Sequence, residues 1–235
     1  MAIKVSVVGA TGRMGKLALE LIEAANDLEL HSALDSRSDA SLSDGADVIF
    51  EVTRLDVSQQ VVAKAISAGQ KIVVGTSGWS AARLAELNDL GRAAVVVIPN
   101  FSVGSMLATR FAAEAGKFFD SIEIVETHHA GKLDSPSGTA VRTAELISAN
   151  RTTPVTAPAA DQDARGQLVA GIPVHSLRLA GVSAKQDVHF GGVSELLTIS
   201  HETTSVSAYT AGILAAIRFA ADAQGLHVGL DAVFK

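Results

Sequence analysis

The sequence has no cysteine among its 235 residues, and it has one tryptophan and one tyrosine. Without thiols the chain can form neither a disulfide nor a thiolate metal site. A dehydrogenase that works through a cysteine thioester is excluded for the same reason. Short-chain dehydrogenases are excluded as well, because their Tyr-x-x-x-Lys pair needs a lysine four residues after Tyr209, where Ile213 stands.

Basic clusters and long apolar runs are also absent. The net charge is −6, which argues against binding to nucleic acid or to an anionic membrane surface. No apolar run reaches the length needed to span a bilayer, and the short apolar start lacks the basic region and cleavage site of a secretory signal. We therefore expect a cytoplasmic protein with no nucleic-acid or membrane partner.

In the first hundred residues, short β-rich runs alternate with segments whose apolar residues recur at helical spacing. This pattern predicts strands at 3–8, 28–34, 48–52, 71–74 and 93–98, and helices at 13–25, 57–68 and 81–90. Strands that alternate with helices are typical of βαβ units, in which a parallel sheet is buried on both faces.

The pattern changes after residue 100. It predicts helices at 104–118, 138–149 and 206–223, strands at 122–128, 174–179, 185–190 and 194–201, and a surface loop at 151–167. Grouped strands with short links favour a mixed or antiparallel sheet. We predict an α/β protein: a Rossmann-type parallel sheet domain at 1–102, completed by 208–235, and a smaller α+β domain with a mixed or antiparallel sheet at 103–207.

A glycine-rich turn joins the first strand to the first helix. Gly9 permits a tight turn, Gly12 lets the backbone approach a pyrophosphate, and Gly15 allows the helix to pack closely on the strand. Asp35, twenty residues after Gly15, ends the second strand, where a carboxylate accepts from a ribose hydroxyl. The alternative is a structural turn without a ligand and a solvated Asp35. Arg37 is placed to meet a 2′-phosphate or to be an exposed loop residue, so the choice between NAD and NADP stays open.

Two further stretches follow strands of the predicted parallel sheet. Gly75-Thr76-Ser77-Gly78 comes after strand 71–74, and Pro99-Asn100-Phe101-Ser102 comes after strand 93–98. Ligands bind at the carboxyl ends of strands in such sheets. Both stretches are therefore candidates for the nicotinamide side of a dinucleotide, although both are also ordinary turn sequences.

The densest polar segment is the loop from Glu126 to Ala140, between a strand and a helix. His128 and His129 are adjacent, so in an extended segment they point to opposite sides and are poor candidates for chelating one metal. His128 and Lys132 suit proton transfer to a small acid, and Ser137-Gly138-Thr139 at a helix start suits a carboxylate. A capped helix with solvated His and Lys explains the same residues equally well. Glu126 either orients a loop group or only ends its strand.

The two motifs together resemble those of the 4-hydroxy-tetrahydrodipicolinate reductase family. They are Gly-x-x-Gly-Arg-Met-Gly and His-His-x-x-Lys-x-Asp-x-Pro-Ser-Gly-Thr-Ala, and the similarity extends through Gly-Thr-Ser-Gly and Pro-Asn-Phe-Ser. The resemblance implies that His128 is a proton donor and acceptor, that Lys132 is a proton donor, and that His129, Gly138 and Thr139 bind substrate. It implies cofactor contacts from Gly9, Ala10, Thr11, Gly12, Arg13, Met14, Asp35, Gly75, Thr76, Ser77, Ile98, Pro99, Asn100 and Phe101, and no metal.

The family resemblance also implies an activity and an assembly. The activity is reduction of a small cyclic dicarboxylate by NADH or NADPH in lysine and diaminopimelate biosynthesis, with residues 103–207 binding substrate and joining the chains of a homotetramer. The stretch between Asp35 and Asp47 is shorter than in longer members of the family. It resembles the shorter actinobacterial type, which tends to use both cofactors. A non-catalytic NAD(P)-binding sensor would leave His128 and Lys132 without a use, and an aspartate or homoserine dehydrogenase would not explain the His-His-x-x-Lys loop.

Overall fold

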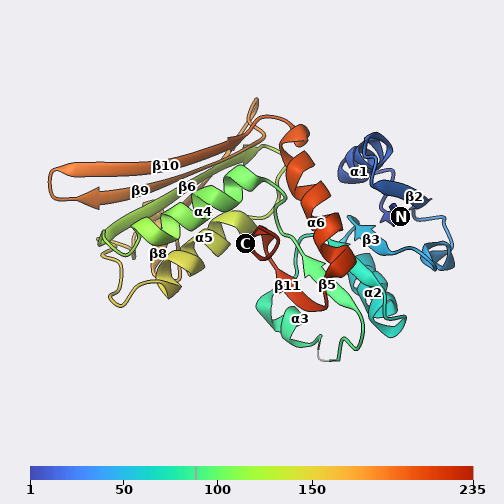
Figure 1. Cartoon of the computed structure of the whole chain (residues 1–235). Coiled ribbons are helices and arrows are strands. Elements are labelled where there is room, and N and C mark those ends of the chain that lie inside the picture. The colour runs from blue at the N-terminus through green and yellow to red at the C-terminus, as the bar shows by residue number, and fades with distance from the viewer. Residues whose placement is uncertain (88, 235) are drawn as a thin grey trace. The chain divides into compact units, whose positions relative to one another are not determined.

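The computed structural model describes residues 1–87 and 89–234 and divides into two compact units (Figure 1). Unit 1 contains Met1–Val103 and the residues from Val206 onward, and unit 2 contains Gly104–Ser205. Unit 2 is thus an insertion in the sequence of unit 1. None of the helices in the described ranges is long and apolar enough to cross a membrane.

Unit 1 is built on a six-stranded parallel sheet with the strand order β11-β5-β4-β3-β1-β2. Its strands are β1 Ile3–Val8, β2 Leu28–Leu34, β3 Val48–Glu51, β4 Lys71–Val74, β5 Ala94–Val97 and β11 Gly225–Val228. Its helices are α1 Arg13–Ala24, α2 Leu55–Ser67, α3 Ala81–Ala85 and α6 Thr210–Asp222, with the 3₁₀ turns Ala40–Ser43, Val206–Tyr209 and Leu230–Ala232. This sheet confirms the predicted Rossmann-type architecture.

The central strands of unit 1 are buried on both faces, as their continuous apolar sequences predict. On one face, Ile49, Ile72 and Val95 pack with Val62 and Ala65 of α2. The alternating residues Phe50, Val73 and Val96 are equally buried and must point to the other face, where α6 contacts β3, β4 and β5. Figure 1 shows the strands between α1 and α6 on one side and α2 and α3 on the other.

Three details of unit 1 differ from the prediction. The helix expected at 81–90 ends at Ala85, and its residue 88 lies outside the described residues. The helix expected at 206–223 begins at Thr210, because residues 206–209 form a 3₁₀ turn. Strand β11 was not predicted: it is four residues long and is formed by pairing with β5 at the sheet edge, which is a tertiary interaction without a periodic sequence pattern.

Unit 2 contains a five-stranded mixed sheet with the order β10-β9-β6-β8-β7, in which β6 and β8 are parallel and the other neighbours antiparallel. The strands are β6 Ser121–His129, β7 Gln167–Val169, β8 Ile172–Leu179, β9 Ala184–Gly192 and β10 Glu195–Thr203. The helices are α4 Val103–Ala115 and α5 Gly138–Ala149, with a 3₁₀ turn at Asp163–Arg165. The mixed sheet confirms the predicted fold class, although β7 was not predicted: it begins at Gln167, the last residue of the stretch predicted as loop.

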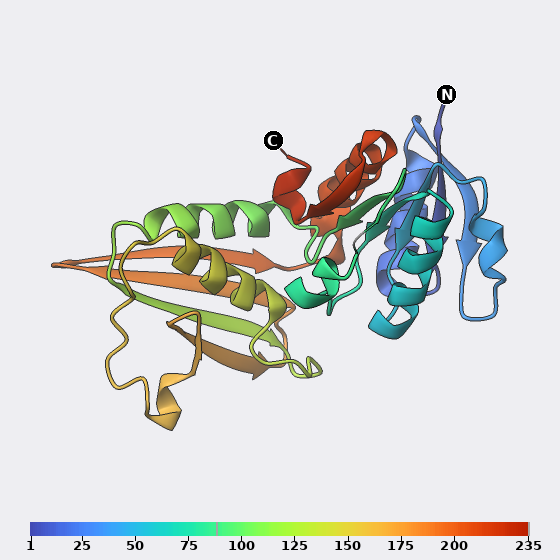
Figure 2. The same cartoon turned by 90° about the horizontal axis from the view of Figure 1, so that it is seen from below.

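One face of this sheet forms the core of unit 2. Ile124, Val174 and Val188 are buried there with Ala112 of α4 and Ile147 of α5. Alternate residues of the same strands point to the opposite face, which we call the open face. Figure 2 shows α4, α5 and the long hairpin of β9 and β10, whose tip extends past the ends of both helices.

Candidate active site

The glycine turn of unit 1 has the geometry that its sequence predicts. Gly9 follows β1 with φ +94°, a conformation that favours glycine, and a Cβ at Gly9 would lie 2.5 Å from the Val52 carbonyl oxygen. A Cβ at Gly15 would lie 2.2 Å from the Gly9 carbonyl oxygen. Gly12 is the N-cap of α1 and has no side chain to cap the first turn, so the turn offers backbone N–H groups to an anion.

Asp35 and Arg37 are bonded to each other at the end of β2. The Asp35 carboxylate accepts from the Arg37 backbone N–H and from its guanidinium, each at 2.9 Å, and these bonds lower the pKa of Asp35. The Arg37 side chain is 87% exposed, whereas that of Asp35 is 20% exposed. The acid is therefore held in place, and the exposed guanidinium is accessible to another anion.

The carboxyl ends of β3 and β4 are joined by a buried carboxylate that our sequence analysis missed. Glu51 is fully buried and accepts from the Thr53 backbone N–H at 2.7 Å and from the Thr76 hydroxyl at 2.8 Å. Ser58, on α2, also donates to it. The Thr76 side chain thus holds its loop to β3, and Ser77 is the exposed member of the three predicted cofactor residues in this loop, Gly75 to Ser77. The sequence signal that could have revealed this residue is an acid at the end of an otherwise apolar strand.

Residues 98–101 divide into buried and accessible members. Ile98 and Phe101 are buried, with the Phe101 ring 5.6 Å from that of Phe50 and against Gly75, where a Cβ would lie 2.7 Å from the ring. Pro99 is exposed and Asn100 half-buried. The Phe101 side chain is therefore packed away from a cofactor, whereas Pro99 and Asn100 are accessible to one. The predicted cofactor residues follow β1, β2, β4 and β5, so they lie at the carboxyl ends of the strands of this parallel sheet.

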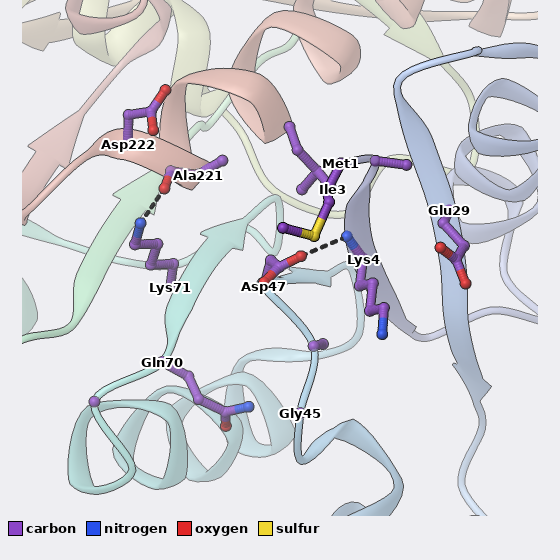
Figure 3. Close-up of a pocket in the computed structure, with 13 residues that line it drawn as sticks. Met1, Ile3, Lys4, Glu29, Gly45, Asp47, Gln70, Lys71, Ala221 and Asp222 are labelled. Atoms are coloured by element: carbon purple, nitrogen blue, oxygen red, sulfur yellow. Dashed lines mark hydrogen bonds between the residues drawn. The ribbon is translucent and has the colours of Figure 1, made fainter.

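A cavity at the amino ends of the strands of the same sheet is a separate feature (Figure 3). It lies at the amino ends of β1 and β4, among Lys4, Asp47, Gln70, Lys71 and Asp222. The Lys4 backbone N–H donates to Asp47 at 2.8 Å, and the Lys71 ammonium donates to the Ala221 carbonyl oxygen. None of the predicted site residues lines this cavity, and ligands of such sheets bind at the carboxyl ends.

Unit 2 contains a buried polar cluster around Glu126. This residue is fully buried on β6, and its carboxylate accepts from His128 Nδ1 at 2.6 Å and from both terminal nitrogens of Arg178 at 2.9 Å. The backbone N–H of Ser137 donates to the same carboxylate at 3.1 Å. His128 and Arg178 are brought together because they are paired in the parallel register of β6 and β8.

Arg178 also holds the loop that carries Lys132. Its Nε and Nη2 donate to the carbonyl oxygens of Lys132 and Asp134, at 3.3 and 2.6 Å. Its Nη1 donates to the Leu177 carbonyl oxygen as well as to Glu126. All five N–H bonds of the guanidinium therefore have partners within the chain. Arg178 therefore acts on the loop and on Glu126.

Lys132 projects from this loop with its ammonium 2.7 and 2.8 Å from the two carboxylate oxygens of Asp134. The helix start that follows is open: Ser137 caps α5 by accepting from Ala140 N, Gly138 is exposed, and a Cβ at Gly138 would meet nothing within 4 Å. Open amides at a helix N-terminus suit a carboxylate ligand, and a cation in the preceding loop adds positive charge to the same segment of the chain.

His129 lies apart from this cluster. Its register partner is Leu179, so it lies on the open face of the sheet, opposite to His128, and it is exposed. The structure thus links His128, the Lys132 loop and the cap residue of α5 through Glu126 and Arg178, whereas the predicted substrate contacts of His129, Gly138 and Thr139 stay predictions. No group of His, Asp and Glu suited to holding a metal ion is found in residues 1–87 and 89–234.

The electrostatics of the cluster favour a neutral His128. Burial lowers its pKa, the Glu126 carboxylate raises it, and Lys132 and Arg178 lower it again, with a net shift downward. Burial alone would raise the pKa of Glu126, but hydrogen bonds from Arg178, Ser176 and His128 lower it. An ionised Glu126 beside a largely neutral His128 is suited to proton transfer near neutral pH.

Comparison with known proteins identifies the family. The N-terminal model of dihydrodipicolinate reductase matches residues 3–101, and the C-terminal model of the same family matches residues 104–234. The chain belongs to the dihydrodipicolinate reductase family. The 4-hydroxy-tetrahydrodipicolinate reductase of Clavibacter michiganensis is 57% identical over 98% of this chain and 86% of its own length. That of Streptomyces griseus is 41% identical over 97% of this chain and 96% of its own length.

Solved structures agree with this membership of the dihydrodipicolinate reductase family. A dipicolinate-bound dihydrodipicolinate reductase from Paenisporosarcina sp. TG-14 has a TM-score of 0.80 and 28% identity, with 98% of this chain and 99% of that chain covered. The NAD complex of GenD2 from gentamicin biosynthesis shares the fold, at a TM-score of 0.62 and 14% identity over 99% of this chain and 90% of that chain. The family and the nucleotide-binding type of unit 1 imply a nicotinamide cofactor.

Proposed function

We propose that this protein reduces 4-hydroxy-tetrahydrodipicolinate to tetrahydrodipicolinate with NAD(P)H, in lysine and diaminopimelate biosynthesis. Its curated relatives carry the name of this reductase. The observation that carries the proposal is the network in which Glu126 bonds to His128 and to Ser137, the cap of α5, while Arg178 holds the Lys132 loop. In this proposal unit 1 binds the cofactor and unit 2 binds the substrate.

The residues of unit 2 divide the remaining chemistry among them. When bound, the nicotinamide supplies a hydride for the ring carbon that loses its hydroxyl, and the net reaction also consumes a proton and releases water. Lys132 and His128 are the two groups placed to deliver protons. The amides of Gly138 and Thr139 hold one carboxylate at the start of α5, and Lys132 contributes positive charge beside it. Fixing the ring in this way raises the rate through orientation.

A coupled assay tests this function. The purified protein would receive the fresh condensation product of pyruvate and aspartate semialdehyde together with NADH or NADPH, and nicotinamide absorbance would be followed. We expect rapid oxidation that depends on the substrate. Tight NAD(P)H binding without oxidation would overturn the proposal and favour a non-catalytic sensor or a reductase of another acid.

We propose further that the enzyme uses both NADH and NADPH. Asp35 is held where a ribose 2′-hydroxyl would donate to it, and the exposed Arg37 can leave Asp35 for a 2′-phosphate. Arg37→Ala should lower kcat/KM for NADPH roughly tenfold, since one charge-assisted contact is lost, and should leave NADH turnover nearly unchanged. Arg92→Ala removes another exposed arginine of unit 1 and serves as the control. Equal loss with both cofactors would exclude this role of Arg37.

The open face of the unit 2 sheet supports assembly into a homotetramer, which we also propose. Leu177, Leu179 and Leu196 lie on this face and are 39, 47 and 71% exposed. Leu177 and Leu179 are next but one to each other on β8, and exposed apolar side chains that lie together are typical of a protein interface. Sedimentation of the 24.2 kDa chain should give four times its mass, and Leu177→Glu should give smaller species. Phe118→Glu, at an exposed position outside the sheet, should not. A monomeric wild-type protein would refute the assembly.

A further inference from the structure

We propose that Glu126 is the positioning residue of the site: its carboxylate orients His128 through Nδ1 and fixes that ring against the Lys132 loop and the start of α5. The inference rests on the proposed reductase activity, because it assigns His128 a role in that reaction. It concerns a residue that touches neither substrate nor cofactor in the roles given above.

The first argument is the completeness of the contacts. One oxygen of Glu126 accepts from His128 Nδ1 at 2.6 Å and from Arg178 Nη1 at 2.9 Å. The other accepts from Arg178 Nη2 at 2.9 Å and from Ser137 N at 3.1 Å. Each oxygen thus has at least two donors, and the side chain of Ser176 on β8 also bonds to this carboxylate. A buried carboxylate with four or more donors is rigid, because moving it would leave several buried polar groups unpaired.

The second argument is what this arrangement does to His128. Because Glu126 accepts at Nδ1, the neutral imidazole carries its proton on Nδ1, and Nε2 is left as the atom that exchanges a proton. The charged groups around the ring are Glu126 on its own strand, Arg178 on β8, and Lys132 and Asp134 in the loop. His201 of β10 lies two strands away from β6, in register with Glu126. Among these, Glu126 is the group that both contacts the ring and favours its charged form.

The third argument is a contrast within the same strand. Glu123 also lies on β6, and it too binds one histidine and one arginine: His175 Nε2 at 2.8 Å and the guanidinium of Arg165. That carboxylate is on the open face and is 30% exposed. The two clusters have the same chemistry, but only that of Glu126 is connected to Ser137 and to the Lys132 loop. Glu123→Gln is therefore a matched control for Glu126→Gln.

The test measures His128 in two independent ways. NMR titration of the imidazoles follows its pKa, with His128→Asn used to assign the signal, and the pH dependence of kcat/KM follows its action in turnover. Glu126→Gln puts amide hydrogens where two donors now point, and it removes the negative charge that raises the pKa of His128. We expect that pKa to fall, the matching limb of the pH profile to move to lower pH, and kcat/KM to drop roughly 10- to 100-fold. NADH affinity should change little.

The variants distinguish positioning from general damage. Glu123→Gln should leave the titration of His128 in place. Glu126→Asp should restore the negative charge and bring the pKa of His128 most of the way back to its wild-type value. Turnover should stay low, because the shorter side chain does not hold the ring in the same position. Should Glu126→Gln not fold, Arg178→Gln is the substitute. It should change the pKa of His128 in the opposite direction, upward, because a neighbouring cation is lost. An unchanged His128 titration in these variants would overturn the inference. A wild-type protein without turnover would refute the proposed function instead, and the titration would still test the positioning.

Discussion

Lys132→Ala is expected to lower kcat/KM by about 10³-fold, with both turnover and substrate binding affected. Lys132 is the one lysine or arginine between Glu126 and the start of α5 in the sequence. Its ammonium is a proposed proton source for the reduction. Its removal also leaves the Asp134 carboxylate without the two hydrogen bonds that it now accepts. A carboxylate substrate would then meet an unpaired negative charge at the site, so its affinity should fall as well.

The measurement is steady-state kinetics with both cofactors, together with calorimetric titration of NADH. Affinity for NADH should be little changed, because Lys132 belongs to unit 2 and the glycine turn to unit 1. Leu133→Ala is the matched control: the neighbouring side chain is 97% exposed, and its loss should leave kinetics near those of the wild type. Full activity of Lys132→Ala would remove this lysine from the site.

The second large effect is expected from a single methyl group at Gly15. A Cβ there would lie 2.2 Å from the Gly9 carbonyl oxygen and 2.7 Å from Ala10 Cα, and both are backbone atoms that cannot rotate away. Gly15→Ala must therefore push α1 off β1, which should destabilise unit 1 by about 3 kcal/mol. The glycine turn would be displaced with the helix, so NADH binding should be lost too. Denaturant unfolding followed by circular dichroism measures the first effect.

Gly12→Ala separates folding from cofactor binding. A Cβ at this position would come no closer than 3.3 Å to the Gly9 carbonyl oxygen, and the φ of −73° is accessible to alanine. Stability should fall by no more than roughly 1 kcal/mol. NADH affinity should still fall tenfold or more, since the methyl group would occupy the space into which a pyrophosphate approaches. If both variants lost stability equally, this division of roles between the two glycines would be wrong.

The sequence predicted those parts of the fold that follow from local patterns. Strands such as Val48–Glu51 are buried on both faces and are continuous apolar runs, and α5 was predicted at its observed bounds because Ser137 caps it. Strand β11 escaped prediction since four residues carry too little pattern, and its pairing with β5 is decided by the packed sheet. The helix predicted at 206–223 was too long at its start, where the helical spacing of apolar residues does not distinguish a 3₁₀ turn from an α-helix.

The candidate site shows the same division between local and distant information. The Asp35–Arg37 pair spans two residues and was foreseen as two neighbouring options. The Glu126–Arg178 pair spans 52 residues and depends on the parallel register of β6 and β8, which no periodicity in either strand specifies. Sequence reasoning therefore left the role of Glu126 open, as a residue that either orients a loop group or ends its strand, and did not pair it with Arg178.

The insertion of unit 2 into unit 1 has a consequence for the order of folding during synthesis. Domains generally fold in the order in which they leave the ribosome, which would put the N-terminal unit first. Here the edge strand of unit 1, β11, is made 122 residues after Val103, and all of Gly104–Ser205 precedes it. Unit 2 is thus the first unit whose whole chain exists. The nascent protein is expected to complete its inserted unit before it can close the sheet on which its own N-terminus lies.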